Sequence, residues 1–291
     1  MANYLSIDVE DYFQVAAFEK VSPPGSWPQR ELRVRENTDR ILQMLDQAGV
    51  RATFFVLGWI AERCRELVET IAAEGHEVAS HGYWHQRVGT RDRTLFRQDV
   101  VRSKHLLEDI TGRPVLGYRA PSYSISPQTA WAFDELYRAG YGYDSSIFPV
   151  RHDLYGFRDF PRFASRLTRS REGVWSVSGD TEDADDGALL EIPITTLRYA
   201  ERNIPIAGGG YFRLHPYAFT RWGLNHINRV ERKPFVFYLH PWELDPEQPR
   251  IGGAGWKSHI RHYLNLGKTE GRFRRLLRDF TFTPMREALV L

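Results

Sequence analysis

Two histidines stand four positions apart in the stretch VASHGYWHQR, as His81 and His85. Residues at i and i+4 lie on one face of a helical turn, where both imidazoles can reach a single cation. An isolated HxxxH also occurs by chance, as two half-buried histidines packed beside aromatic rings. The pair therefore predicts a metal site only if other segments supply a carboxylate ligand, a base and an acid.

Acidic residues that could complete such a site follow an apolar segment at the start of the chain. SIDVEDY contains Asp8, Glu10 and Asp11. A carboxylate beside two imidazoles gives the three-ligand set that catalytic zinc uses, with one position left for water. A second carboxylate can take a proton from that water. The alternative interpretation of these acids is a solvated turn.

Two later segments offer an acid and an electrostatic partner. His240 directly follows the apolar run FVFYL, and a histidine placed opposite the attacked bond can protonate a leaving amine. In GYRAPSY, Arg119 could orient a carboxylate through a bidentate pair, and the backbone N–H of Tyr123 suits an oxyanion. A structural histidine and a proline-ordered loop with a surface arginine are the alternatives. Trp242 could stack on a sugar or lie in the core.

The elements that must position these residues alternate between apolar and amphipathic segments. Strands are expected at the start of 3–13 and of 115–125 and within 51–61 and 76–81, and helices within 36–50, 63–75 and 93–112. The stretch 128–146 is expected to form a helix, a glycine turn and a strand in succession. Such alternation predicts a parallel sheet with crossover helices. Several units in succession suggest a (β/α) barrel, whose chemistry gathers at the carboxyl ends of the strands.

The pattern changes from about residue 150. A loop-rich insertion is expected around 150–190, with ADDG as a turn, and the tail from Trp256 is expected to be helical. Its basic run GRFRRLLRDF reads as the polar side of an amphipathic helix. Because the chain shows no internal repeat or low-complexity linker, we expect one domain spanning residues 1–291.

Composition excludes several classes of function. Lys and Arg total 39 against 37 Asp and Glu, a balance unlike that of nucleic-acid-binding proteins. No run reaches the roughly 18 apolar residues of a membrane span. The single cysteine, Cys64, forms no intrachain disulfide, and the first residues lack a secretory pattern, so a cytoplasmic location is expected. Aromatic residues, at 13%, suit stacking against sugar rings.

In order along residues 4–245, the chain has an acidic strand end, an HxxxH, an RxPxY, an Asp-containing segment and a late strand ending in histidine. Together these segments resemble the polysaccharide deacetylases, the NodB-homology group of carbohydrate esterase family 4. DVEDYFQV and FYLHPWELDP are similar to the branch tied to bacterial exopolysaccharide gene clusters. The resemblance implies a distorted (β/α) barrel and metal-dependent removal of N-acetyl groups from a hexosamine-containing saccharide. The metal it implies is Zn²⁺, with Co²⁺ or Ni²⁺ as alternatives.

The resemblance also implies a role for each matching residue. These roles are catalytic base for Asp8, metal ligands for His81 and His85, orientation of the base for Arg119, oxyanion stabilisation for Tyr123, the family's Asp segment for Asp144, and catalytic acid for His240. The first motif departs from the common pattern, because Val9 stands where a second acid is usual. Glu10 or Asp11 must then supply the acidic metal ligand, and the spacing in some relatives favours Glu10.

Two other functions stay open. An amidase resembling allantoinases, acting on a small non-sugar C–N bond, predicts a small closed pocket without a groove lined by Trp and Tyr. A carbohydrate-binding protein that has lost catalysis is supported by the missing second acid. The intact set of His81, His85, Arg119 and His240 argues against that third interpretation.

Overall fold

The computed structural model describes residues 1–151, 156–170, 174–177 and 184–290, with only the backbone described at 184–187 and 290. The strands are β1 (Asn3–Val9), β2 (Thr53–Val56), β3 (Glu77–Ser80), β4 (Gly117–Tyr118), β5 (Tyr143–Asp144), β6 (Ser165–Ser170), β7 (Trp175–Val177), β8 (Ala184–Glu191), β9 (Thr196–Tyr199), β10 (Arg202–Pro205), β11 (Val236–Leu239) and β12 (Phe282–Thr283). The α-helices are α1 (Val34–Ala48), α2 (Gly58–Arg63), α3 (Arg65–Ala73), α4 (Arg93–Thr111), α5 (Ala132–Arg138), α6 (Gly209–Leu214), α7 (Tyr217–His226), α8 (Trp256–Tyr263) and α9 (Leu266–Asp279).

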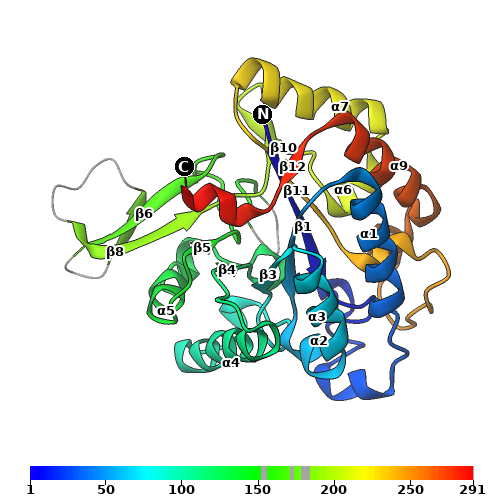
Figure 1. Ribbon diagram of the computed structural model, residues 1–291, viewed down its shortest axis with the longest axis horizontal. Helices are drawn as coiled ribbons and strands as arrows, with labels where there is room; N and C mark the ends of the chain where they lie inside the picture. Colours follow the sequence, from blue (N-terminus) through cyan, green and yellow to red (C-terminus); the bar gives the residue numbers. More distant parts are fainter. Residues whose placement is uncertain (152–155, 171–173, 178–183, 291) are drawn as a thin grey trace.

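A curved parallel sheet forms the centre of the molecule, in the order β11-β1-β2-β3-β4-β5-β8. The sheet does not close, because no strand pairing joins β8 to β11 within the described residues. A side-chain contact crosses this gap instead: the amide of Val236 donates to Thr195 Oγ1 at 2.7 Å. Helices pack around the outside of the sheet (Figure 1). The architecture is the expected α/β fold, a distorted (β/α) barrel.

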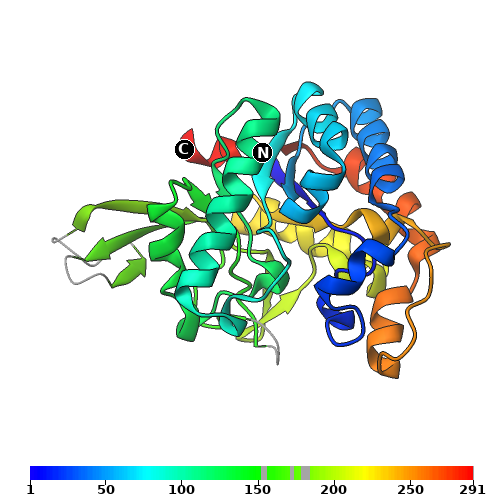
Figure 2. The ribbon, with the colours of Figure 1, turned by 90° about the horizontal axis from the view of Figure 1, so that it is seen from below.

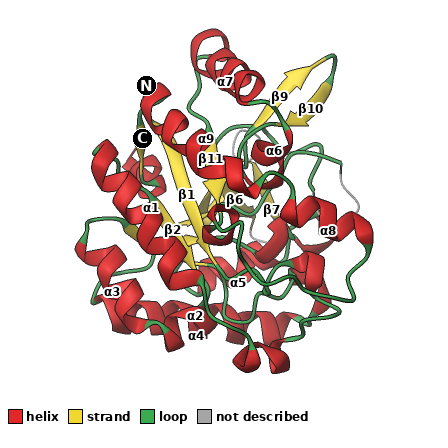
Figure 3. Ribbon diagram, turned by 90° about the vertical axis from the view of Figure 1, so that its right-hand side faces the viewer, coloured by secondary structure: helices red, strands yellow, loops and turns green. Residues whose placement is uncertain are grey.

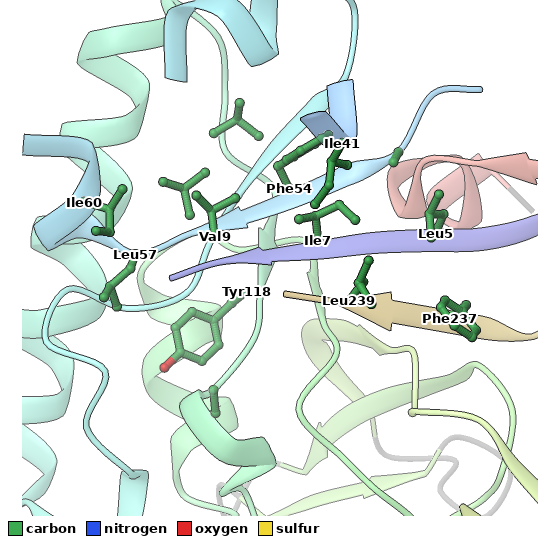
Figure 4. Packing of buried hydrophobic residues seen from close by; sticks show 14 of the residues in the cluster. Leu5, Ile7, Val9, Ile41, Phe54, Leu57, Ile60, Tyr118, Phe237 and Leu239 are labelled. Carbon is green, nitrogen blue, oxygen red and sulfur yellow. The ribbon is translucent and has the colours of Figure 1, made fainter. Parts of the chain in front are cut away.

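Alternation along β1 separates the polar interior from the helix-facing core. Leu5, Ile7 and Val9 point outward and pack with residues of α1, β2 and β11 (Figure 4). The side chains between them, including Ser6 and Asp8, therefore face the interior of the barrel. The same alternation along β11 buries Phe237 and Leu239 outside and turns Val236 and Tyr238 inward.

The amphipathic patterns place most helices correctly. In α1, Ile41, Leu42, Met44 and Leu45 are buried, and Gly49 ends the helix at a φ of 64°. In α9, the basic residues of the run lie on the solvent side, whereas its Phe273, Leu276 and Leu277 are buried, as expected. The apolar stretch 51–61 is a strand only over Thr53–Val56, because α2 begins at Gly58.

The segment expected to be rich in loops instead extends the sheet. Strands β6 and β7 lie antiparallel beside β8, and the ADDG expected as a turn is the start of β8. The β6–β8 pair projects from the body in two perpendicular views (Figures 1 and 2), and the β9–β10 hairpin projects near α7 (Figure 3). The loop prediction failed because Leu167 is the one apolar residue of β6, so the sequence lacks the apolar alternation that indicates a strand. Among the described helices, none has the length and apolar character to cross a membrane.

Candidate active site

Asp8 and Arg119 form a buried ion pair at the carboxyl ends of β1 and β4. Arg119 Nη1 donates to Asp8 Oδ1 at 2.6 Å and to Ser6 Oγ at 2.7 Å. Its remaining nitrogens donate to the carbonyl and hydroxyl of Ser145, so the pair is not the bidentate fork that was expected. Because both partners are buried, this geometry fixes the Asp8 carboxylate in one orientation.

Glu10, His81 and His85 form the one cluster among the described residues whose side chains could jointly hold a metal ion. Their ligand atoms all lie within 4.8 Å of one another. Glu10 Oε2 lies 2.6 Å from His85 Nε2 and 3.8 Å from His81 Nε2. This carboxylate oxygen is buried and faces two imidazole nitrogens, an arrangement that suits a shared cation.

The surroundings prepare these side chains for a cation. His81 Nδ1 lies 2.8 Å from the carbonyl oxygen of Arg119, a contact that leaves Nε2 free as a ligand. Burial lowers the pKa of His81 to about 4, so the ring is neutral, as a metal ligand must be. Burial alone would raise the pKa of Glu10, but the neighbouring His85, His240 and His81 hold it well below the ordinary value. The donor set of one carboxylate and two imidazoles fits a divalent metal such as zinc.

The two histidines meet through a loop, which corrects the helical turn expected from their spacing. Residues 81–87 contain no helix, and Gly82 and His85 take φ values of 71° and 51°. Asp99 on α4 fixes this loop by accepting hydrogen bonds from the backbone amides of Tyr83 and Trp84. The ring centroids of His81 and His85 are consequently 5.3 Å apart.

Asp11, the other candidate for the acidic ligand, points away from the cluster. Its Oδ2 accepts hydrogen bonds from the amides of Arg33 and Val34 at 2.7 and 2.9 Å, and its Oδ1 accepts one from Tyr12. Asp11 therefore caps the amino end of α1, where a carboxylate is favoured. Asp11 is therefore outside the candidate metal cluster, and of the two acids left open by the sequence only Glu10 belongs to it.

His240 directly follows β11 and completes the group of side chains in the site. Its Nδ1 lies 2.7 Å from Glu243 Oε1, and its Nε2 faces Asp8 Oδ2 at 3.9 Å and Glu10 Oε1 at 3.7 Å. Burial would lower the pKa of His240, but the carboxylates of Glu10, Glu243 and Asp8 outweigh that effect and raise it to about 9. At neutral pH the ring therefore carries a proton on Nε2, facing the acids.

Glu243 and Arg213 support His240 and were missed by sequence reasoning. Glu243 Oε1 also accepts the backbone amide of His240 at 3.1 Å, and its Oε2 lies 2.6 Å from Arg213 Nε. The i, i+3 spacing within HPWE could have revealed Glu243. Arg213 carries no comparable signal, because it approaches from α6.

Tyr123 and Trp242 take positions that differ from those expected. The amide of Tyr123 already donates to Ala120 at 3.0 Å, so the oxyanion role assigned to that amide is not met by this geometry. The hydroxyl of Tyr123 instead donates to Asp8 Oδ2 at 3.3 Å. Trp242 is buried in a stack with His262 and donates its Nε1 hydrogen to Glu10, so its ring is not a platform for sugars.

Asp144 lies beneath this site rather than in it. Its Oδ1 accepts a hydrogen bond from Ser146 Oγ at 2.6 Å, and it faces Glu191 across the β5–β8 pair. Burial and the charge of Asp144 raise the pKa of Glu191, which favours the protonated form of Glu191 beside Asp144. This carboxylic pair holds the strand ends that carry Ser145, a partner of Arg119.

Comparison with known sequences assigns the chain to a family. The profile described as polysaccharide deacetylase matches residues 25–141, and a domain of unknown function, DUF3473, matches residues 145–290, half of the chain. The chain belongs to the polysaccharide deacetylase family. Its expected membership is therefore confirmed, while the exopolysaccharide branch stays a prediction.

Curated relatives match the chain over about a third of its length. A peptidoglycan-N-acetylglucosamine deacetylase of Bacillus cereus is 33% identical over 101 residues, 34% of this chain and 37% of the relative. A peptidoglycan deacetylase of Helicobacter pylori is 31% identical over 108 residues, 37% of this chain and 36% of the relative. The chain thus spans little more than a third of the length of these relatives.

Solved structures match over nearly the whole chain. A Mycobacterium smegmatis protein described as a polysaccharide deacetylase covers 99% of this chain and 88% of its own, with a TM-score of 0.60 and 18% identity. Puue allantoinase gives a TM-score of 0.61 at 13% identity, also over 99% of this chain and 88% of its own. At these identities the likeness establishes the shared barrel fold.

Proposed function

We propose that this protein is a metal-dependent hydrolase that removes N-acetyl groups from a hexosamine-containing saccharide. The observation that carries the proposal is the convergence of three functional groups at the strand ends. His240 Nε2 lies within 4 Å of Asp8, which pairs with Arg119, and within 4 Å of Glu10, which belongs to the cluster with His81 and His85. A site of this composition supplies a base, a cation ligand set and an acid for amide hydrolysis.

Glu10, His81 and His85 would hold the cation. A divalent metal bound there would supply Lewis acidity, which polarises a carbonyl and lowers the pKa of water. Zinc is the metal we propose, because one carboxylate and two imidazoles leave a position open for water in its tetrahedral geometry. The ring contact of His81 with the Arg119 carbonyl keeps the ligating nitrogen directed at this position.

Asp8 acts as the general base in the proposed reaction. Arg119 and Tyr123 orient its carboxylate, so that it takes a proton from the water that attacks the acetamide carbon. His240 then donates its Nε2 proton to the sugar nitrogen as the C–N bond breaks, which releases acetate and a free amine. Asp8 Oδ2 lies 3.9 Å from His240 Nε2, so the proton taken from water can return to the imidazole and restore both groups.

A small cavity beside His85 has room for one substituent of a sugar, such as an acetyl group, rather than for a whole sugar ring. It has a volume of about 60 Å³, and its walls include the rings of Trp27 and Trp84. Gln14 Nε2 and Ser22 Oγ, in two side chains that also line it, are buried and have no hydrogen-bond partner among the described residues. Ring faces beside unpaired amide and hydroxyl groups suit sugar hydroxyls and N-acetyl groups.

The relatives suggest the class of saccharide. Proteins similar to this chain are named as deacetylases of peptidoglycan and of chitooligosaccharide. The segments DVEDYFQV and FYLHPWELDP resemble the exopolysaccharide branch of the family, so we propose a bacterial exopolysaccharide, or its oligosaccharide precursor, as the physiological substrate.

Metal content and acetate release test the proposal together. Elemental analysis of the wild type should give one zinc, cobalt or nickel ion per chain, and chitooligosaccharides should release acetate. His81→Ala should lose both properties, because two ligands hold a cation far more weakly than three. His105→Ala removes an exposed histidine on α4 and is the matched control, in which both properties should persist.

Each failure has a distinct meaning. If the protein holds stoichiometric metal but releases no acetate, the metal site is supported and chitooligosaccharides are rejected as substrates. Absence of metal, with no activity after addition of zinc, cobalt or nickel, would reject the proposed hydrolase and favour a silent carbohydrate-binding protein.

A further inference from the structure

A cavity of about 1120 Å³ lies in the half of the chain that matches the domain of unknown function. One wall comes from residues 149–151 and 158–163, which follow β5, and the other from the β9–β10 hairpin, which follows β8. Asn203 in the hairpin joins the two walls, because its Nδ2 donates to the carbonyl of Pro149 at 2.7 Å. Both walls thus continue from the carboxyl ends of strands, as does the candidate active site.

Aromatic side chains connect this cavity to the active site. Tyr211 lines the cavity and contacts Phe148, with ring centroids 6.1 Å apart. Phe148 in turn contacts Tyr123, at 5.7 Å, and the hydroxyl of Tyr123 reaches Asp8. A chain of three aromatic rings therefore links the cavity to the site.

The charges around the cavity are predominantly positive. Its lining contains five arginines and two acids, an excess of three positive charges in a protein whose net charge is only +2. Glu231 pairs with Arg162 at 2.6 Å, and Glu201 pairs with Arg198 at 2.7 Å.

Three cavity arginines are left with little or no compensation. Arg151 and Arg202 have no carboxylate within ion-pair distance among the described residues, and Arg158 reaches Asp159 only at 4.0 Å. Guanidinium groups bind carboxylates and phosphates through paired hydrogen bonds, so this lining favours an anion.

The remaining lining suits a sugar rather than a bare ion. The rings of Phe160, Phe163 and Tyr211 offer apolar faces. Asn203 Oδ1 is buried and accepts no hydrogen bond from the described residues, so it is available to a hydroxyl donor. An acceptor of this kind would repel a lone anion but would complement the hydroxyl groups that surround an anionic substituent on a sugar.

We propose that this cavity binds an anionic group, carboxylate or phosphate, carried by the saccharide whose N-acetyl group enters the active site. The inference rests on the proposed deacetylase function and narrows its substrate to acidic saccharides. It also gives the domain of unknown function a role in substrate selection, because all the arginines concerned belong to its segment.

Equilibrium binding tests the inference without relying on turnover. Titration calorimetry of the metal-free wild type should show tighter binding of an oligogalacturonate than of a neutral chitooligosaccharide of equal length. The preference should fall as salt rises from about 0.05 to about 0.5 M, because exposed charges are then screened. Inorganic pyrophosphate is the second probe, and it distinguishes a phosphate-bearing precursor from a uronate-bearing polymer.

A charge-reversed pair identifies the site. Arg151→Glu with Arg202→Glu should weaken binding of the preferred anion about tenfold or more, from the loss of two exposed charge contacts and the gain of two repulsive ones. Lys268→Glu with Arg278→Glu on α9 makes the same change in net charge outside the cavity and should bind like the wild type. The control variant on α9 should also release acetate from neutral chitooligosaccharides at the wild-type rate.

The outcomes separate this inference from the proposed function. Equal weakening in both double variants, or no preference for either anion over the neutral oligomer, would overturn the anion site. If the wild type releases no acetate but still binds anions selectively, the deacetylase function is refuted and the anion site is supported.

Discussion

Glu243→Gln is expected to move the alkaline limb of the pH dependence of kcat to lower pH. Glu243 Oε1 lies 2.7 Å from His240 Nδ1 and is one of the groups that raise the pKa of that histidine to about 9. A hydrogen bond to a charged group contributes about 1.5–3 kcal/mol, which corresponds to about one to two pH units. The variant should therefore lower the pKa of His240 to roughly 7–8.

The direction of the change in rate follows from the role of His240 as an acid. Only the protonated imidazole can donate to the leaving amine, so kcat falls as pH rises through the pKa of His240. A bound cation lowers that pKa in the wild type and in the variant alike, so the difference between the two profiles persists. The assay is acetate release between about pH 5 and 10, with kcat fitted at each pH.

Two controls isolate the electrostatic effect. Glu243→Gln also deprives the buried Arg213 of its carboxylate, so the free energy of unfolding should fall by about 3–5 kcal/mol. That loss reduces the amount of folded enzyme but does not set the midpoint of the limb. Glu247→Gln removes an exposed carboxylate from the same segment and should leave the midpoint in place. An unchanged midpoint in Glu243→Gln would refute the assignment of His240 as the acid.

Three further outcomes are expected. Asp8→Asn should reduce kcat by about 10²–10⁴ while metal content is retained, and turnover near the wild-type rate would reject Asp8 as the base. Asp11→Ala should keep the metal and lose about 1–2 kcal/mol of unfolding free energy in urea, through loss of the α1 cap; metal loss would instead restore Asp11 as a ligand. Burial lowers the pKa of His76 to about 4 and of His262 to about 3. The unfolded chain therefore binds protons first, and the stability of the metal-free protein should fall as pH drops from about 6.5 to 4; a flat urea profile would contradict this.

The sequence predicts most of the site because its residues follow strands. Apolar runs before Asp8, His81 and His240 indicate parallel strands, and their carboxyl ends meet at one edge of the barrel. Spacing could not decide between Glu10 and Asp11, since both follow the same strand by a few residues. The choice depends on the backbone after Val9, which turns Asp11 toward the amino end of α1.

Other features depend on contacts that no local pattern encodes. The approach of His85 to Glu10 requires positive φ angles at Gly82 and His85 and an anchor on α4, sixteen residues beyond Tyr83. The hydrogen bond from the Tyr123 amide to the Ala120 carbonyl likewise follows from the tight turn that begins at Pro121. Helical spacing and motif position give the right residues in both cases and the wrong local geometry.

The two matched segments cannot be separate catalytic units. The proposed base and acidic ligand, Asp8 and Glu10, lie on or directly after β1, before the segment 25–141, and the proposed acid follows β11, beyond that segment. Strand β1 pairs with β2 on one side and with β11 on the other, so the sheet itself brings the two segments together. The first segment supplies His81, His85 and Arg119, and the second supplies His240 with its support from Glu243. The proposed hydrolysis therefore requires the whole barrel, to which the domain of unknown function contributes the proposed acid, His240.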